Sequence, residues 1–254
     1  TDWTLPKLRI ALISDFHVSG PAMSLTRLDQ ITRRTNATSP DIVLLGGDFA
    51  AAAKPSYSVP PISAVAERLS QLRSQFGTYA VPGNHAWEVF RAATEMRGPP
   101  NLFAHGLEDA GLPVLSNQAV KIEQGGFWIL GIEAQRAFRS RLFRFEGLDD
   151  LPKTLAQVTD DAPAMLLAHE PDIFPDVPSR IQLTLSGHTH GGQIQIFGKT
   201  PVVPSRYGSR YAYGHVHEDG RDLVVSGGLG CSGIPLRLGV IPEITIVDLQ
   251  QAGT

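Results

Sequence analysis

Residues 8–17 read LRIALISDFH, an apolar run that ends in Asp15 and His17. A short run rich in Leu and Ile is typical of a buried β-strand. Four later apolar runs are likewise followed by Asp, Asn or His: residues 41–46 before Asp48, 78–82 before Asn84 and His85, 164–168 before His169, and 181–186 before His188 and His190. Packing does not explain why only these polar residues follow five strands. Ligands of α/β sheets bind at the carboxyl ends of the strands, so we expect one shared site.

The residue types at these strand ends are those that bind divalent metal ions. Carboxylate and amide oxygens together with imidazole nitrogens suit Mn, Fe, Zn or Co. Two ions that act on one phosphoryl group lie about 3.5–4 Å apart. That spacing requires a bridging carboxylate, for which Asp48 at a strand end is the natural candidate. We therefore expect two divalent metal ions and the hydrolysis of a phosphate ester.

The motifs DxH, GD, GNH, H and GHxH, in this order, resemble the calcineurin-like metallophosphoesterases. The sequence GHTHGGQ and the later segments GLG and RLGVIPEI resemble the bacterial branch of that family that includes the YkuE-type phosphoesterases and some UDP-diacylglucosamine pyrophosphatases. The resemblance covers most of the chain. It implies an α/β fold, a four-layer α/β/β/α sandwich of two mixed β-sheets flanked by helices.

The resemblance also implies a role for each motif residue. One ion would be held by Asp15, His17, Asp48 and His190, and the other by Asp48, Asn84, His169 and His188. His85 would bind no metal; it would face the phosphate, stabilise developing charge and protonate the leaving oxygen. Two positions depart from the family pattern. Ala86 follows GNH where many relatives have an acidic residue, and Ala51 stands where some have an Asp that orients the catalytic histidine, so the sequence leaves open what holds His85.

The rest of the chain fits a single domain spanning residues 1–254. Helical spacing of apolar residues predicts helices over residues 24–35, 61–75, 101–110 and 151–158. Residues 119–123 and 127–132 flank Gln124-Gly125-Gly126, which predicts a β-hairpin. After GHTHGG the chain is rich in strand signals up to a final strand over residues 243–249. This pattern favours two packed sheets with helices outside.

Composition limits the classes of partner. The 254 residues carry a net charge of −3, so no stable nucleic-acid partner is expected. The single cysteine, Cys231, excludes an internal disulfide and a cysteine-rich metal site. No apolar run has the length and lack of charge of a membrane-spanning helix. The sequence starts at Thr1 and not at Met, so an upstream signal or anchor, peripheral membrane contact and the compartment all stay open.

The substrate is predicted from two groups of residues. Arg206, Tyr207 and Arg210 lie in a loop after GHTHGG and are candidates to bind a second phosphate, a nucleotide or a sugar; the alternative is an ordinary surface loop. Trp87, Phe90 and Phe103 follow GNH and form an apolar lip or simply pack. These features favour a phosphodiester or pyrophosphate bond in a small or lipid-linked substrate. A nuclease acting on short nucleic acid is the alternative enzyme, and a non-catalytic metal-binding scaffold is the alternative from another class.

Two further patterns receive ordinary interpretations. Residues 228–233 match GxGxxG, but Pro235 follows directly and too little chain remains for a dinucleotide-binding unit. We expect a glycine loop near the metals. His215 and His217 have metal-like spacing but lie beside a predicted turn, so we expect a solvated or strand-edge pair.

Overall fold

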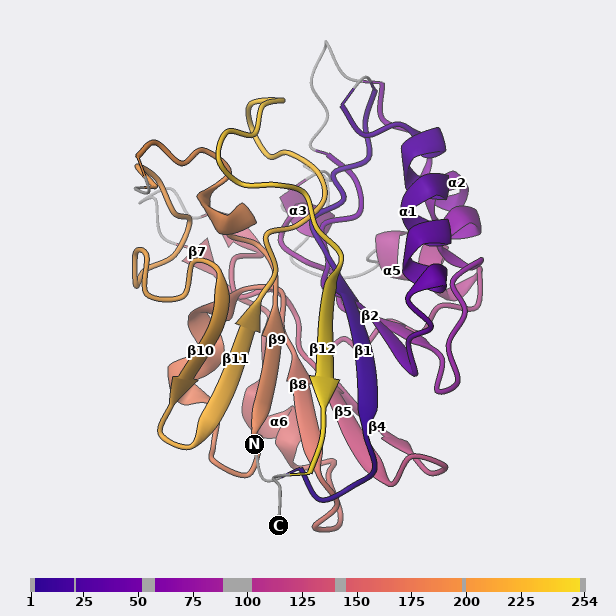
Figure 1. Cartoon of the computed structure of the whole chain (residues 1–254), viewed down its shortest axis with the longest axis vertical. Helices are drawn as coiled ribbons and strands as arrows, with labels where there is room; N and C mark the ends of the chain where they lie inside the picture. Colours follow the sequence, from indigo (N-terminus) through magenta and orange to yellow (C-terminus); the bar gives the residue numbers. More distant parts are fainter. Residues whose placement is uncertain are drawn as a thin grey trace.

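The computed structural model describes residues 3–20, 22–51, 58–88, 102–139, 145–197 and 200–251, and two β-sheets lie face to face in it (Figure 1). The first sheet has the strand order β12-β1-β2-β3. Its strands are β1 (Leu8–Ile13), β2 (Ile42–Leu45), β3 (Thr78–Ala80) and β12 (Thr245–Leu249). β1, β2 and β3 run parallel, whereas β12 pairs with β1 in the antiparallel sense.

The second sheet has the strand order β10-β11-β9-β8-β5-β4. Its strands are β4 (Gln118–Ile122), β5 (Phe127–Gly131), β8 (Ala164–Leu167), β9 (Leu183–Ser186), β10 (Gly214–Glu218) and β11 (Arg221–Val225). The four inner strands are parallel, and the edge strands β4 and β10 are antiparallel to their neighbours. The hairpin expected around Gln124-Gly125-Gly126 is therefore confirmed as β4–β5.

Helices cover the outer face of each sheet. The helices α1 (Leu25–Ala37), α2 (Ile62–Leu69) and α5 (Leu102–Glu108) lie beside the first sheet. The α6 helix (Leu151–Leu155) and the 3-10 helix η1 (Pro171–Asp176) contribute to the apolar layer on the second sheet. Short elements complete the described chain: α3 (His85–Glu88), η2 (His190–Gly192), β6 (Phe138–Arg139) and β7 (Phe145–Glu146). The expected four-layer α/β/β/α sandwich is confirmed.

The layers follow from the alternation of side chains along the strands. On β1, Ile10 and Leu12 pack between the two sheets, whereas Ala11 and Ile13 pack against the helices of the first sheet. Both sets are fully buried. A strand that is apolar on both faces lies inside a layered α/β fold, because helices cover one face and another sheet covers the other.

The α2 helix is shorter than the apolar spacing predicts. It ends at Leu69, after which the backbone N–H groups of Gln71 and Leu72 donate to the carbonyls of Arg68 and Leu69 in tight turns. Phe76 leaves the helix face and packs with the layer between the sheets, with its ring edge-on to Phe127 at 5.7 Å. Burial between the sheets thus outweighs continuation of the helix.

Within the described part of the chain, no helix has both the length and the apolar character needed to cross a membrane.

Candidate metal centre

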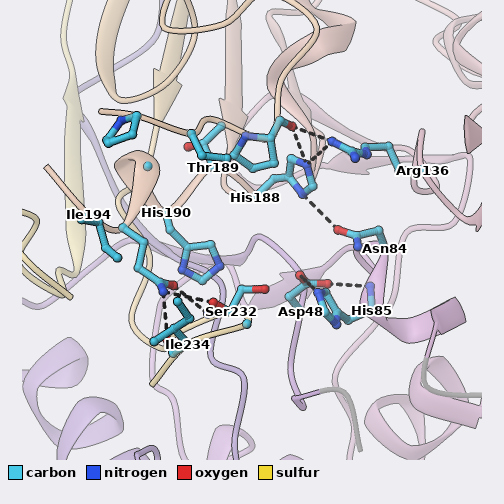
Figure 2. Close-up of a pocket in the computed structure, with 16 residues that line it drawn as sticks. Asp48, Asn84, His85, Arg136, His188, Thr189, His190, Ile194, Ser232 and Ile234 are labelled. Carbon is cyan, nitrogen blue, oxygen red and sulfur yellow. Dashed lines mark hydrogen bonds and ion pairs between the residues drawn. The ribbon is translucent and has the colours of Figure 1, made fainter. Parts of the chain in front are cut away.

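The predicted polar residues meet where the carboxyl ends of the two sheets come together. Asp15 and His17 follow β1, Asp48 follows β2, and Asn84 follows β3. From the other sheet, His169 follows β8, and His188 and His190 follow β9. All seven predicted ligands are buried. Figure 2 shows Asp48, Asn84, His188 and His190 pointing towards a common space.

The first group consists of Asp15, His17 and His190, whose ligand atoms are close enough to hold one ion. The Nε2 atom of His190 lies 3.0 Å from Nε2 of His17 and 3.4 Å from Oδ1 of Asp15. Asp15 is held from behind, because its Oδ2 accepts the Ser14 hydroxyl at 2.7 Å and the backbone N–H of His188 at 3.0 Å. The carboxylate is therefore fixed before any ion arrives.

The second group consists of Asn84, His169 and His188. The amide oxygen of Asn84 lies 3.2 Å from Nε2 of His169 and 3.0 Å from Nδ1 of His188. Asp48 stands between the two groups: its Oδ2 is 3.5 Å from Nε2 of His17 and 3.2 Å from Nε2 of His169. One carboxylate oxygen thus faces both groups, which is the arrangement expected of a bridging ligand.

Burial and neighbouring charges set the protonation of the cluster. Burial lowers the pKa of His17 and His188 well below the ordinary value, and burial together with Arg237 lowers the pKa of His190 to about 3. Burial would also lower the pKa of His169, but Asp48 outweighs it and raises that pKa to about 10. The same pairing brings the pKa of Asp48 well below its ordinary value, against the effect of burial. Three imidazoles are therefore neutral at pH 7, while His169 is protonated in the metal-free protein.

The backbone turns sharply at most of these residues. Positive φ angles occur at Asp15 (55°), His17 (44°), Asp48 (56°), His188 (69°) and His190 (54°). A residue with a Cβ atom seldom adopts such angles, which cost roughly 1–2 kcal/mol each. Strained backbone of this kind clusters at functional sites and persists because the surrounding structure fixes it. The strands β1, β2 and β9 therefore end in turns that aim these side chains at one point.

The glycine of GNH is required by contact with Asp48. Gly83 has a φ of 83°, and a Cβ atom there would lie 2.5 Å from both the backbone N and Oδ1 of Asp48. Any other residue would push Asp48 out of its position between the two groups. The glycine loop predicted over residues 228–233 also lies beside the cluster, since a Cβ on Gly228 would meet the Asp15 side chain at 2.8 Å.

His85 lies at the edge of the cluster. Its Nε2 is 3.9 Å from Oδ2 of Asp48, its ring is edge-on to His17 at 4.7 Å, and its side chain is 15% exposed. The backbone N–H of His85 donates to Oδ1 of Asp48 at 2.9 Å, which ties α3 to the cluster. His17, Asp48 and His85 are also close enough to hold an ion. The assignment of His85 as the residue that faces the phosphate remains a prediction.

The donor set fits divalent cations. It consists of carboxylate and amide oxygens and imidazole nitrogens, which are ordinary ligands for Mn, Fe, Zn and Co. Nδ1 of His169 lies 2.6 Å from the carbonyl oxygen of Gly46. Because a carbonyl oxygen can only accept, Nδ1 carries a proton and donates it. Nε2 is then the nitrogen that can bind a cation once the proton on Nε2 is lost. Comparison with known proteins agrees with this geometry, since the model of the calcineurin-like phosphoesterase family matches residues 8–219.

The chain belongs to the calcineurin-like phosphoesterase family. The matched interval contains every predicted metal ligand and His85. Family membership supports a metal-dependent phosphoesterase, and the expected resemblance to the YkuE-type branch is confirmed.

Similar proteins come from animals and bacteria. A "Transmembrane protein with metallophosphoesterase domain" of Danio rerio is 31% identical over 263 residues, which cover 98% of this chain and 54% of that protein. An "Uncharacterized metallophosphoesterase" of Helicobacter pylori is 30% identical over 246 residues, 96% of this chain and 60% of that protein. YkuE of Bacillus subtilis is 29% identical over 247 residues, 95% of this chain and 79% of YkuE. The chain thus spans little more than half the length of the first two.

This calcineurin-like phosphoesterase has a cavity of about 510 Å³ beside the cluster. Asp48, Asn84, His85, His188 and His190 line its inner wall. Another part of its wall includes Ile194, Val202, Ser232 and Ile234, and Pro204 lies next to His188. Gln193, the last residue of GHTHGGQ, fixes that wall: its side chain donates to the carbonyls of Ser232 and Ile234 at 3.0 Å and accepts the Ser232 N–H at 2.7 Å (Figure 2).

Arg136 is a cavity residue that the sequence analysis did not identify. Its Nη1 donates to the carbonyl of Pro204 at 2.7 Å and lies 3.4 Å from Nε2 of His188 (Figure 2). Its guanidinium stacks on Phe145, with 3.9 Å from Cζ to the ring centroid. Glu170 holds this loop by accepting the backbone N–H groups of Gln135 and Arg136, and burial raises the pKa of Glu170 to about 7. One signal was present: Arg136 follows β5, which ends at the same sheet edge as β8.

The predicted substrate residues Arg206, Tyr207 and Arg210 lie apart from the lining of this cavity. Arg210 forms a two-pronged pair with Glu218 at 2.7 and 3.0 Å. Arg206 donates to the carbonyl of Asp172 and lines a neighbouring hollow that Arg136 shares. Tyr207 packs against Tyr211. The arrangement places Arg206 one hollow away from the cluster, and the role of the three residues in substrate binding stays a prediction.

The aromatic residues after GNH pack, as the alternative interpretation held. Trp87 is buried, lies edge-on to Phe138 and donates its indole N–H to Glu133 at 3.1 Å. Phe103 is buried in the same cluster. Phe90 lies outside the described residues. His215 and His217 lie on the edge strand β10, as predicted, and both contact Oδ1 of Asp222, at 2.7 and 2.8 Å.

Proposed function

We propose that this chain hydrolyses a phosphodiester or pyrophosphate bond in a small or lipid-linked substrate with two metal ions. One observation carries the proposal. Oδ2 of Asp48 lies 3.5 Å from Nε2 of His17 and 3.2 Å from Nε2 of His169, between two separate groups of nitrogen and oxygen donors. Each group holds further nitrogen and oxygen donors of its own, so a carboxylate shared between them supports two ions rather than one.

The proposal divides the ligands into two sets that share Asp48. One set is Asp15, His17, Asp48 and His190, and the other is Asp48, Asn84, His169 and His188. When bound there, two divalent cations supply Lewis acidity to a phosphoryl group and increase the acidity of water. The ligand atoms suit Mn, Fe, Zn or Co.

The protein's own side chains perform the remaining tasks. His85 borders both the cluster and the cavity, so it is placed to stabilise charge on the phosphoryl oxygens and to give a proton to the leaving oxygen. Arg136 projects into the cavity beside His188 and offers N–H donors in a planar array, which suits phosphate oxygens. Its stacking on Phe145 and the Glu170 contacts hold it there.

The cavity favours a phosphate that carries a bulky apolar or aromatic substituent. Polar groups of the cluster and Arg136 line part of it, and the apolar residues Ile194, Val202 and Ile234 also line it. A monoester dianion gains little from an apolar wall, whereas a diester or pyrophosphate places its second substituent against it. The Danio rerio relative is named a transmembrane protein with a metallophosphoesterase domain, which agrees with a whole protein that works at a membrane.

A hydrolysis panel tests the proposal. The metal-reconstituted chain is assayed with a phosphomonoester, a phosphodiester, a cyclic nucleotide, a UDP-sugar lipid and an oligonucleotide. We expect the diester and the lipid-linked pyrophosphate to give the highest kcat/KM. Preference for the oligonucleotide would support the nuclease alternative, which the net charge of −3 disfavours. Metal binding without turnover on any substrate would support the scaffold alternative.

A further inference from the structure

Large apolar side chains are exposed in two loops at the mouth of the cavity. Isolated exposed apolar residues are ordinary, but a group of them marks a binding surface. We call this group the apolar rim, and its members are Ile196, Phe197, Val202, Ile234, Leu236, Leu238 and Ile241. Phe197 and Ile241 are the most exposed, at 101% and 81%. Figure 1 shows the loop between β11 and β12, in yellow, at the end of the molecule where the strands β1 and β9 terminate.

The two loops form one surface because backbone hydrogen bonds join them. The N–H of Gln195 donates to the carbonyl of Leu238 at 2.7 Å, and the N–H of Leu238 donates to Gln193 at 3.0 Å. The Gln193 side chain adds bonds to Ser232 and Ile234. The exposed apolar residues are thus held out by a fixed framework.

The apolar rim continues into the cavity beside the cluster. Val202 is 74% exposed and Ile234 58% exposed, yet both line the cavity that contains Asp48 and His85. Figure 2 shows Ile194 and Ile234 near His190, at the side of the pocket away from Asp48 and His85. A molecule that covers this surface therefore has its apolar part next to its reacting phosphate. That description fits an amphiphile, whereas a protein partner has no need to reach the cluster.

The distribution of charge on the rim also favours an amphiphile. In the described segments 194–197, 200–204 and 232–241 the one charged residue is Arg237. Its guanidinium points inward, donating to the carbonyls of Gly227 and Gly230 at 2.7 Å and to Nδ1 of His190 at 3.0 Å. Within these described segments the rim therefore presents no acidic side chain to repel lipid phosphates and no charge to desolvate on entering an apolar phase, and the neighbouring Glu243 is bonded to Tyr213 and to the N–H of Gly227.

We propose that the apolar rim inserts into the surface of a lipid bilayer and that the chain acts on phosphoesters of lipids held there. The acyl end of the substrate would stay in the bilayer at the rim while the phosphate enters the cavity. This inference rests on the proposed function, because it specifies where that substrate is taken from.

Vesicle binding tests the inference without turnover. The full chain is sedimented with phosphatidylcholine vesicles, and the variant L236S/I241S is compared with I246S. Ile246 is an exposed residue on β12 outside the rim. Leu236 and Ile241 are absent from the lining of the cavity. We expect about a tenfold or larger loss of binding in L236S/I241S, from the apolar area removed, and none in I246S. Binding should persist when salt rises from about 0.1 to about 1 M, since screening weakens only charge-driven contacts.

The outcomes separate this inference from the proposed function. Hydrolysis of soluble bis-p-nitrophenyl phosphate, measured without vesicles, should be equal in the native chain and L236S/I241S. Hydrolysis without vesicle binding, or equal vesicle binding by L236S/I241S and the native chain, would overturn the membrane inference alone. Conversion of a native dimer to a monomer by L236S/I241S, with no vesicle binding, would assign the rim to self-association instead. Vesicle binding without hydrolysis of any panel substrate would overturn the proposed function.

Discussion

The Nε2 atoms of His17 and His190 lie 3.0 Å apart, and their rings stack with centroids 4.9 Å apart. Arg237 can only donate, and its Nη2 lies 3.0 Å from Nδ1 of His190. Nδ1 is then an acceptor, so the proton of neutral His190 is on Nε2 and points at His17. A cation held by Nε2 of His190 would require this proton to move to Nδ1, and the Arg237 contact there would have to shift. The metal-free site therefore stores a proton at the position where an ion is expected.

Metal content should reveal the bridging role of Asp48. After reconstitution with Mn, elemental analysis of the native chain should approach about two ions per chain. Asp48→Ala should lose both, because both ligand sets share that carboxylate, whereas His17→Ala should weaken one. An active protein without bound metal would contradict the two-metal proposal, and equal losses in the two variants would contradict the shared position of Asp48.

Gly83→Ala should disturb the site through contact and not through backbone strain alone. Gly83 and Gly111 have φ angles of 83° and 79°, but an added Cβ meets Asp48 at 2.5 Å in the first and nothing within 4 Å in the second. Both substitutions should lower stability by roughly 1–2 kcal/mol, measured by denaturant unfolding. The Gly83 variant should in addition lose Mn. Equal metal content in the two variants would show that Asp48 accommodates the methyl group.

His85→Ala should keep the metal ions and lose about 10²–10⁴-fold in turnover, the usual effect of removing a positioned acid or charge stabiliser. Its Nε2 is 3.9 Å from Asp48, at the border of the cavity. A substrate with a very good leaving group should lose less, if proton donation is the role. Loss of one metal ion in this variant would show that His85 is a ligand, as its proximity to His17 and Asp48 allows.

Metal affinity should rise with pH. In the metal-free protein Asp48 raises the pKa of His169 to about 10 from an ordinary value of 6.5. An ion must displace that proton, so the apparent association constant should increase about tenfold per pH unit between pH 7 and 9 for each proton released. Calorimetric titrations in two buffers with different ionisation enthalpies would measure the proton count. Binding with no proton release would contradict the protonation state given to His169.

The raised pKa of His169 also makes the stability of the metal-free protein depend on pH. The folded state binds the His169 proton more tightly than the unfolded state, so the contribution is complete below pH 6.5 and disappears as the pH rises through about 10. The lowered pKa of Asp48 arises from the same ion pair with His169, so it does not add a second contribution to the stability. Urea unfolding with a chelator should show this fall, and His169→Gln should remove it.

Replacing Arg136 and replacing Arg206 together with Arg210 should change KM for different substrates. Bis-p-nitrophenyl phosphate should be cleaved with higher kcat/KM than p-nitrophenyl phosphate. Arg136→Ala should raise KM for both, because the guanidinium reaches the cavity beside His188. Arg206→Ala with Arg210→Ala should raise KM for a nucleotide-linked substrate more than for the small diester. A better monoester substrate would contradict the diester assignment, and equal effects of the double replacement would remove the loop from substrate binding.

The sequence by itself determined the layers and the identity of the cluster. Short apolar runs such as residues 8–13 specify buried strands wherever they lie, and the carboxyl ends of parallel strands meet at one edge. That geometry brought Asp15, Asp48 and His188 together from local pattern alone. The helix at residues 61–75 was overestimated, because nothing local reveals that Phe76 packs between the sheets.

Only the tertiary structure decided what surrounds the cluster. Arg136 follows β5, but no local pattern gives it a role; it reaches the cavity because Glu170, 34 positions away in the sequence, holds its loop and its guanidinium stacks on Phe145. The loops that carry Ile194 and Ile234 become one apolar wall through backbone hydrogen bonds and the Gln193 side chain. Motif residues follow strands and are placed by local rules, whereas cavity walls are made by loops whose positions depend on contacts across the whole chain.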